Sequence, residues 1–164
     1  MKTLIAISDT HGCIQGVLNL KARLLENSYT VHLGDGFSDI RELYHEYPKK
    51  IYAVRGNCDG GIPLPTEEVL EIEGSRVLCC HGHEYGVKSG LSRLAYRAQE
   101  LNCNVVLYGH THRASIEELG GVTLVNPGTM KYPLESGGSY AYLVFNGKKV
   151  VPVIVGNPMT SPAY

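Results

Sequence analysis

The stretch Tyr108-Gly109-His110-Thr111-His112 directly follows the apolar run at 105–107, and it decides how the rest of the chain is interpreted. The apolar run predicts the end of a buried strand. Because residues i and i+2 of an extended chain point to the same side, His110 and His112 are expected to reach one spot together. Gly109 before them leaves room for a close approach. Two imidazoles so placed are typical of metal ligands.

Length and composition indicate one ordinary globular domain, residues 1–164, with 157–164 expected to be a loose tail. The chain is 43% hydrophobic and 19% charged, which does not fit a disordered protein. Its net charge of −1 predicts no extended nucleic-acid surface. We expect no membrane span, because no apolar stretch is long enough, and no signal peptide. The five cysteines have no disulfide-framework spacing, so they predict reduced thiols in a cytoplasmic protein.

The first third of the chain predicts a parallel sheet. Apolar runs at 3–7, 29–33 and 51–54 indicate buried strands, and the segments between them have the apolar spacing of helices. This β-α-β-α-β order predicts parallel strands joined by right-handed crossovers. Ser38 is the predicted N-cap of the second helix, and Pro48 is its predicted stop.

The rest of the chain predicts hairpins around one further helix and strand. Turn signals at 73–75, 120–121 and 146–147 separate pairs of strand-like runs, and the last of them is Asn-Gly, the strongest hairpin signal. Apolar spacing over 91–101 predicts the helix. Pro152 places the last strand at a sheet edge. Parallel units followed by hairpins predict an α/β fold of two mixed β-sheets packed as a sandwich, flanked by helices.

Side chains able to bind a metal follow five of the predicted strands, each at the carboxyl end. Because sites in open α/β sheets form beyond those ends, the five loops are expected to converge. Each group alone is weak evidence, since a lone histidine is more often a hydrogen-bonded core residue. Their occurrence together favours one shared site. The groups are Asp9-Thr10-His11, Gly34-Asp35, Gly56-Asn57, His81-Gly82-His83 and Gly109-His110-Thr111-His112.

These motifs resemble the calcineurin-like metallophosphoesterases, specifically their small single-domain bacterial and archaeal phosphodiesterase branch. The resemblance extends over about residues 2–145 and implies a β-sandwich flanked by helices, in agreement with the pattern above. The motifs that carry it are Ile7-Ser8-Asp9-Thr10-His11-Gly12, Leu33-Gly34-Asp35, Val54-Arg55-Gly56-Asn57-Cys58-Asp59, Cys80-His81-Gly82-His83, Tyr108-Gly109-His110-Thr111-His112 and Asn126-Pro127-Gly128-Thr129.

The resemblance implies a phosphodiesterase with a binuclear metal centre, in which a hydroxide bridging two divalent ions attacks phosphorus in line. Asp35, Asn57 and His81 are the implied catalytic residues. Nitrogen and oxygen ligation without thiolate suits manganese, with iron, nickel, zinc or cobalt as alternatives. The implied ligands are Asp9, His11 and His112 for the first ion, Asn57, His81 and His110 for the second, and Asp35 between them.

Cys58 departs from the commonest pattern of the family, in which a histidine follows Gly-Asn and protonates the leaving group. A thiol is a poor acid at neutral pH, so we expect a small phosphodiester with a leaving group that needs little protonation, such as an aryl group. A phosphomonoesterase is the alternative that Cys58 disfavours. We expect Cys58 to be a packed structural residue. Asp59 is expected either to orient a metal-binding histidine or to hold a turn.

Arg55 and His83 are the candidate substrate contacts. The alternatives are a salt bridge beneath the loop for Arg55 and a hydrogen bond to a metal ligand for His83. Segments 60–66 and 84–90 are expected to border the substrate. His32 in a predicted strand and His45 on a predicted helix are expected to be structural or solvent-facing.

A non-catalytic alternative also follows from the resemblance. One eukaryotic branch of the family, the retromer subunit, uses the same fold as a protein-binding scaffold. Its ligand positions are altered, whereas all seven are intact in this chain. The family also suggests a homo-oligomer.

Overall fold

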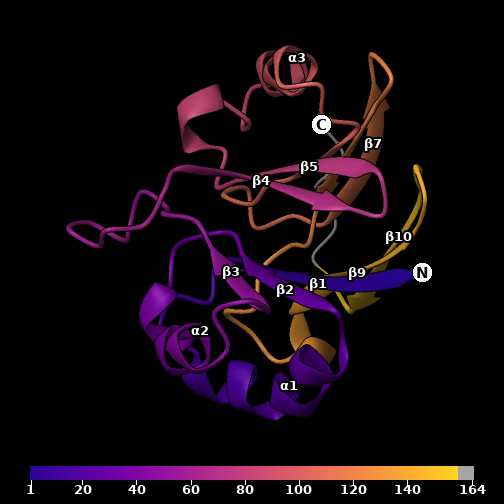
Figure 1. Ribbon diagram of the computed structural model, residues 1–164. Helices are drawn as coiled ribbons and strands as arrows, with labels where there is room; N and C mark the ends of the chain where they lie inside the picture. Colours follow the sequence, from indigo (N-terminus) through magenta and orange to yellow (C-terminus); the bar gives the residue numbers. More distant parts are fainter. Residues whose placement is uncertain (159–164) are drawn as a thin grey trace.

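The computed structural model describes residues 1–158 and shows two five-stranded β-sheets packed face to face, with helices outside (Figure 1). The first sheet has the strand order β10-β9-β1-β2-β3, and the second has the order β4-β5-β6-β8-β7. Both sheets contain parallel and antiparallel pairs. The predicted α/β sandwich of two mixed sheets is therefore confirmed.

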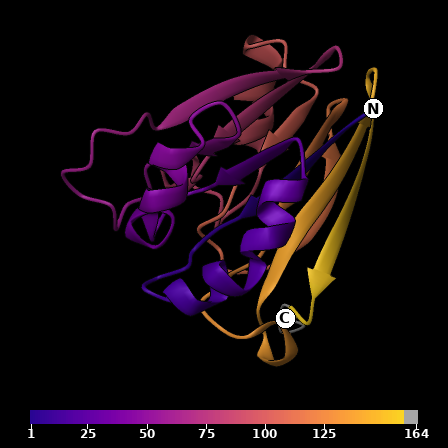
Figure 2. The same cartoon turned by 60° about the horizontal axis from the view of Figure 1, so that its bottom comes forward.

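The first sheet contains the predicted β-α-β-α-β unit. Its three parallel strands pair in the order β1-β2-β3, and β9 pairs with the other side of β1 in the antiparallel direction. The helices α1 and α2 cover the outer face of this sheet, at the bottom of Figure 1, and come forward in Figure 2. The bounds are β1 Lys2–Ile7, α1 Ile14–Glu26, β2 Tyr29–His32, α2 Arg41–Glu46, β3 Ile51–Ala53, β9 Ser139–Asn146 and β10 Lys149–Gly156.

Strand β1 is a continuous apolar run because both of its faces are buried. Leu4 and Ala6 face the core between the two sheets, whereas Ile5 and Ile7 face the helices of the outer layer. All four side chains have exposed fractions of 1% or less. A strand buried on both faces does not alternate apolar and polar residues, and β1 follows that rule.

The predicted N-cap of the second helix is wrong. Ser38 lies inside a separate 3-10 turn, Phe37–Asp39, and α2 begins after Ile40 without a side-chain cap. The turn is held by other segments of the chain instead, because the Asp39 carboxylate accepts the Gly12 N–H at 2.9 Å. Tertiary contacts have replaced local capping here.

The second sheet combines two hairpins with a parallel centre. Strands β5, β6 and β8 run parallel, and β4 and β7 form antiparallel edges. Helix α3 packs on the outer face, at the top of Figure 1. The bounds are β4 Glu67–Ile72, β5 Ser75–Cys80, α3 Ser92–Glu100, β6 Val105–Leu107, β7 Ser115–Leu119 and β8 Val122–Asn126, with 3-10 turns at His83–Tyr85 and Leu134–Ser136.

Strand β10 lies at the edge of the first sheet, as Pro152 predicted. Beyond it, the Asn157 N–H donates to the Gly138 carbonyl at 3.1 Å, and Pro158 forms a bridge with Gly137. The remainder of the segment predicted to be a loose tail, 159–164, lies outside the described residues. Among residues 1–158, no helix combines the length and apolar character needed to cross a membrane.

Candidate metal centre

The loops that follow the strands of both sheets meet through hydrogen bonds. The Asp9 N–H donates to the Gly34 carbonyl at 3.0 Å, which joins the loops after β1 and β2. The Gly109 N–H donates to the His81 carbonyl at 2.9 Å, which joins the loops after β6 and β5. The His110 N–H then reaches Asp9 Oδ2 at 3.0 Å and connects the two sheets. The convergence expected from the strand ends is therefore present.

Backbone strain is concentrated at this meeting point. Among residues 1–158, seven residues other than glycine have positive φ, and five of them are candidate ligands. Such conformations cost about 1 kcal/mol or more each and persist where the surrounding structure imposes them. The five are Asp9 (φ 54°), His11 (φ 43°), Asp35 (φ 59°), His110 (φ 72°) and His112 (φ 61°).

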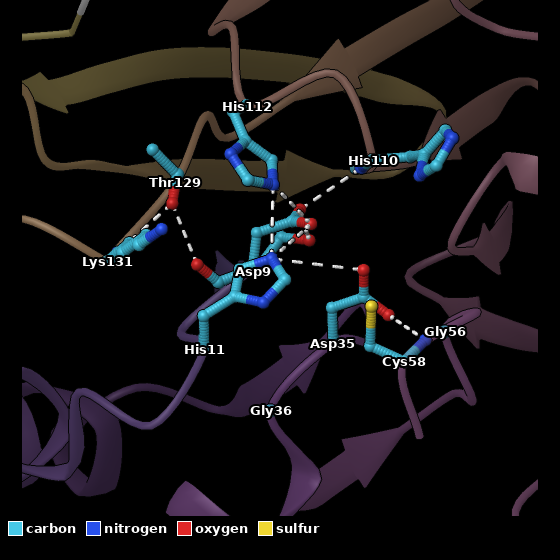
Figure 3. Close-up of polar contacts among 12 residues, drawn as sticks. Asp9, His11, Asp35, Gly36, Gly56, Cys58, His110, His112, Thr129 and Lys131 are labelled. Carbon is cyan, nitrogen blue, oxygen red and sulfur yellow. Dashed lines mark hydrogen bonds and ion pairs between the residues drawn. The ribbon is translucent and has the colours of Figure 1, made fainter. Parts of the chain in front are cut away.

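His110 and His112 both lie at the metal centre, but not with the extended geometry that the strand pattern predicts. Strand β6 ends at Leu107, and the chain then turns, with the Thr111 N–H donating to the Gly109 carbonyl at 2.9 Å. Because both histidines have positive φ, they do not alternate like strand residues. Their rings lie apart in Figure 3 and join two different groups of potential ligands.

The first group consists of Asp9, His11 and His112. The Nε2 atoms of His112 and His11 lie 3.1 Å and 3.6 Å from Asp9 Oδ1. The same two ring nitrogens are 3.1 Å from each other. Asp9 Oδ1 is buried and has no hydrogen-bond partner among the described residues. A buried carboxylate oxygen without a hydrogen bond destabilises the folded protein, so Asp9 Oδ1 needs a binding partner of another kind.

The second group consists of Asp35, His81 and His110. His81 Nε2 lies 3.2 Å from Asp35 Oδ2 and 3.2 Å from His110 Nδ1. The other nitrogen of His81, Nδ1, donates to the Leu33 carbonyl at 2.7 Å. This bond places the proton of a neutral ring on Nδ1 and leaves the Nε2 lone pair directed into the group.

Asp35 lies between the two groups. Its Oδ2 is 3.2 Å from His81 Nε2 and 3.9 Å from His11 Nε2, so one oxygen faces a histidine of each group. Its Oδ1 accepts the Cys58 N–H at 2.7 Å, the contact drawn beside Cys58 in Figure 3. This position agrees with a carboxylate shared by two ions.

The residues present fit divalent cations. Imidazole nitrogens that face one another at 3.1–3.2 Å repel through their lone pairs unless a proton or a cation lies between them. A cation bound by each group would also satisfy the unpaired Asp9 Oδ1. Nitrogen and carboxylate ligands suit manganese, iron, nickel, zinc and cobalt.

The charges of the Asp35 carboxylate and the His81 imidazole stabilise each other. Burial acts to raise the pKa of Asp35, but His81 and the Cys58 N–H outweigh it and hold the pKa well below its usual range. Burial likewise lowers the pKa of His81, but Asp35 and Asp9 outweigh it and raise the pKa overall. Metal binding therefore has to displace a proton that the carboxylates favour on His81, so affinity is expected to rise with pH.

Asn57, the remaining predicted ligand, makes no side-chain hydrogen bond to a member of either group within residues 1–158. Its side chain is exposed, and its amide donates to Cys58 Sγ at 3.5 Å.

The prediction that Cys58 is a packed structural residue is wrong, because its side chain is exposed and lies beside Asp35 and His11. Burial and then the charge of Asp35 raise the pKa of the Cys58 thiol. The thiol is therefore protonated at neutral pH.

Asp59 was expected either to orient a metal-binding histidine or to hold a turn, and its contacts are with the backbone of the Asp35 loop. Its buried carboxylate accepts four backbone N–H groups, from Asp35 at 2.7 Å, Gly56 at 2.9 Å, Gly36 at 3.0 Å and Phe37 at 3.1 Å. It contacts no metal-binding histidine through a hydrogen bond in residues 1–158. The turn-holding role is the one observed.

His32 is a supporting residue whose role sequence reasoning did not specify. It is fully buried, its Nδ1 accepts the Gly34 N–H at 3.1 Å, and its Nε2 lies 3.0 Å from Thr10 Oγ1. Burial lowers its pKa to about 4, so the ring is neutral. The interior position of His32 in an apolar strand was the available signal. His45, by contrast, is exposed.

Two further polar residues support the loops from the second sheet. Thr129 Oγ1 donates to the Asp9 carbonyl at 2.7 Å (Figure 3). Asn126 Nδ2 donates to the Gly109 carbonyl at 3.1 Å and to Thr111 Oγ1 at 2.9 Å. Both belong to the Asn-Pro-Gly-Thr motif, which sequence analysis recognised without assigning these contacts.

The two predicted substrate contacts are Arg55 and His83, and the Nε2 atom of His83 lies 3.8 Å from Glu84 Oε1. Within residues 1–158 the half-buried Arg55 makes no salt bridge, so the alternative of an ion pair beneath the loop is not observed. The His83 ring centroid lies 5.4 Å from that of His81, and its buried Nδ1 has no hydrogen-bond partner among these residues. Burial and then the charge of His81 lower the pKa of His83.

Gly109 provides a direct test of the close packing at the site. A Cβ atom there would lie 2.1 Å from Ser8 Oγ and 2.8 Å from Asp9 Oδ2. Gly109→Ala is therefore expected to displace Asp9 and to weaken manganese binding, measured by calorimetry, by about ten- to a hundredfold. Gly60→Ala is the matched control, because its Cβ would meet nothing within 4 Å. Unchanged manganese affinity in Gly109→Ala would show that Asp9 is not a ligand.

Comparison with known proteins gives a consistent result. The domain described as "Calcineurin-like phosphoesterase superfamily domain" matches residues 1–148. Probable metallophosphoesterase YsnB of Bacillus subtilis is 33% identical over 142 residues, covering 85% of this chain and 82% of that protein. Phosphodiesterase YfcE of Escherichia coli is 30% identical over an alignment of 183 residues, covering 96% of this chain and 94% of that protein.

Solved structures share the same fold. A predicted phosphoesterase from Streptococcus pneumoniae TIGR4 has a TM-score of 0.80 and 26% identity, covering 94% of this chain and 89% of that chain. Vps29 from Chaetomium thermophilum has a TM-score of 0.74 and covers 99% and 98% of the two chains, but its 19% identity shows a likeness of fold alone. With a domain match over 148 of 164 residues and relatives of 30–33% identity, this chain belongs to the calcineurin-like phosphoesterase superfamily.

Proposed function

We propose that this protein is a phosphoric diester hydrolase that uses two divalent metal ions, with manganese as the preferred metal. Asp9, His11 and His112 would hold the first ion, and His81 and His110 the second, with Asp35 shared between them. The observation that carries the proposal is the buried Asp9 Oδ1, which has three imidazole Nε2 atoms within 3.1–3.9 Å and no hydrogen bond among residues 1–158.

When bound, two such ions would act as Lewis acids that activate water for in-line attack and neutralise the charge that develops on the phosphate. The chain itself fixes the geometry in which this happens. Asp35 is oriented by the Cys58 N–H, and His81 is oriented by the Leu33 carbonyl. Because both contacts come from the backbone, these two catalytic residues are held before substrate binds.

Asn57 is proposed as the remaining ligand of the second ion and as the third catalytic residue. Its Oδ1 would bind the ion, while its Nδ2 is the atom that donates to Cys58 Sγ. Arg55 and His83 are proposed to contact the phosphate, since the guanidinium makes no salt bridge in residues 1–158 and the neutral imidazole has an unpaired Nδ1. A guanidinium recognises phosphate oxygens through paired hydrogen bonds.

Turnover of an aryl phosphodiester tests the proposal. The protein should be freed of metal, reloaded with manganese, and assayed with bis(p-nitrophenyl) phosphate by release of nitrophenolate. We expect metal-dependent hydrolysis and no hydrolysis after chelation. Two bound ions without turnover of any phosphate ester would instead favour the scaffold role.

Cys58 tests why a diester is preferred to a monoester. Because the protonated thiol is a weak acid, Cys58→Ala is expected to retain most of the diesterase activity. Cys58→His introduces an imidazole that can protonate a leaving group, so hydrolysis of p-nitrophenyl phosphate should rise by about tenfold or more. A loss in Cys58→Ala comparable to the loss of a ligand would show that the thiol takes part in the reaction.

We also propose a location and retain two predictions about the organisation of the chain. All five cysteines are free thiols in the structure, which suits the reducing cytoplasm that we propose as the location. The organisation of residues 1–164 as a single domain stays a prediction, as does assembly into a homo-oligomer.

A further inference from the structure

A recess lies beside the metal centre, against the outer face of the second sheet. It is a cavity of about 670 Å³ between the segment at 87–91 and strand β7. Thr111, which lies between the ligands His110 and His112, lines one end of it. The cavity also includes part of the segment 84–90 that sequence analysis expects to border the substrate. A ligand at the metal centre can therefore extend into this cavity.

Two cationic side chains line the cavity, Lys88 and Arg113. Arg113 is half-buried, yet in residues 1–158 its guanidinium makes neither a salt bridge nor a hydrogen bond. Lys88 is exposed, also makes no salt bridge within these residues, and lies close enough to His110 for its charge to help lower the pKa of that ring. One acidic residue, Glu117, faces the same space.

The backbone that carries Arg113 is fixed. The Arg113 N–H donates to Thr111 Oγ1 at 3.1 Å, and Asn126 Nδ2 donates to the same oxygen at 2.9 Å. The cavity also contains the paired hydroxyls of Tyr108 and Ser115, 3.0 Å apart, and apolar wall from Leu91. An unpaired guanidinium on a fixed backbone, hydroxyl groups and apolar surface together suit an anion carried on a larger organic group.

We infer that this cavity binds a second anionic group of the substrate, a phosphate carried on the same organic arm as the scissile diester. The preferred substrates are then nucleotide-like diesters with a further phosphate, rather than diesters with two neutral arms. Arg113 and Lys88 bind that phosphate, and Glu117 limits the net positive charge of the cavity to one. The inference rests on the proposed phosphodiesterase function and adds a specificity to the same site.

Two chromogenic substrates that differ by one phosphate test this inference. Thymidine 5′-(p-nitrophenyl phosphate) and its 3′-phosphorylated form should be compared with the manganese-loaded enzyme. We expect KM to be about tenfold lower for the 3′-phosphorylated form, with kcat little changed, because the extra contact lies away from the reacting phosphorus. Calorimetry with thymidine 3′,5′-bisphosphate and thymidine 5′-phosphate should give the same order of affinities without turnover.

Variants that remove a positive or a negative charge from the cavity are expected to change the preference in opposite directions. Arg113→Gln and Lys88→Gln should each reduce the preference for the 3′-phosphate, whereas Glu117→Gln should increase it. Lys21→Gln removes an exposed lysine from α1, outside the cavity, and should leave the preference unchanged. Equal KM values for the two substrates, or a preference that survives in Arg113→Gln, would overturn the inference. Absence of turnover with both substrates would instead reject the phosphodiesterase proposal.

Discussion

Replacing Asp35 with alanine is expected to abolish hydrolysis of phosphodiesters while the protein remains folded. Asp35 Oδ2 faces His81 at 3.2 Å and His11 at 3.9 Å, so its loss removes a carboxylate that lies between the two ligand groups. The fall in kcat/KM should exceed the hundred- to thousandfold that is lost with a single active-site hydrogen-bond donor. Steady-state kinetics with bis(p-nitrophenyl) phosphate and metal analysis of the same sample measure both effects.

The fold should survive this change because Asp35 contributes little to the core. Its replacement removes the hydrogen bond from the Cys58 N–H, worth about 1–3 kcal/mol when the partner is charged. Asp35→Asn is the matched control, since it keeps an oxygen for that N–H but lacks the charge, and it should be equally inactive. An Asp35→Ala protein with a tenth of the normal activity and two bound ions would contradict this role.

Replacing Asp59 with alanine is expected to give the largest loss of stability. The change leaves four buried backbone N–H groups of the Asp35 and Gly56 loops without their acceptor. An unsatisfied buried donor costs about 1–3 kcal/mol, and some of the four will find water, so we expect a total loss of about 3–5 kcal/mol. Urea unfolding of the metal-free proteins, followed by circular dichroism, measures the difference in free energy of unfolding.

The same carboxylate predicts how stability depends on pH. Burial acts to raise the pKa of Asp59, but the four N–H groups outweigh it and lower the pKa overall. A group whose pKa is lower in the folded state stabilises the protein above its unfolded pKa of about 3.9, and this contribution is lost as pH falls through the folded value. Stability should therefore fall less steeply below about pH 4 in Asp59→Asn than in the unchanged protein. Identical slopes would show that the pKa of Asp59 is the same in the folded and unfolded states.

The sequence predicted the fold because apolar periodicity and turn chemistry agree along most of the chain. The doubly buried β1 and the Asn-Gly hairpin between β9 and β10 are local signals that the tertiary structure reinforces. Ser38 shows the opposite case. Its sequence context fits an N-cap, but distant segments hold that turn, because the Gly12 N–H donates to Asp39 and the Asp59 carboxylate accepts the Phe37 N–H. Contacts between distant segments are not visible in a local pattern.

The candidate site was predictable in its residues but not in its geometry. Spacing and strand ends brought forward six side chains that the structure places in two groups. The separation of His110 from His112 depends on positive φ at both residues, which the loop imposes and which residue type does not reveal. The exposure of Cys58 and the role of Asp59 also depend on contacts between distant segments, so they could be determined only from the folded structure.

Two cations are expected to bind between these strand-end loops, and a crystal structure of the manganese-soaked protein would show them. Anomalous scattering should reveal two ions. One should contact Asp9, His11 and His112, the other should contact His81 and His110, and Asp35 should lie between them. A soaked crystal with no anomalous peak at these side chains, or with Asp9 and His112 turned away from each other, would contradict the account.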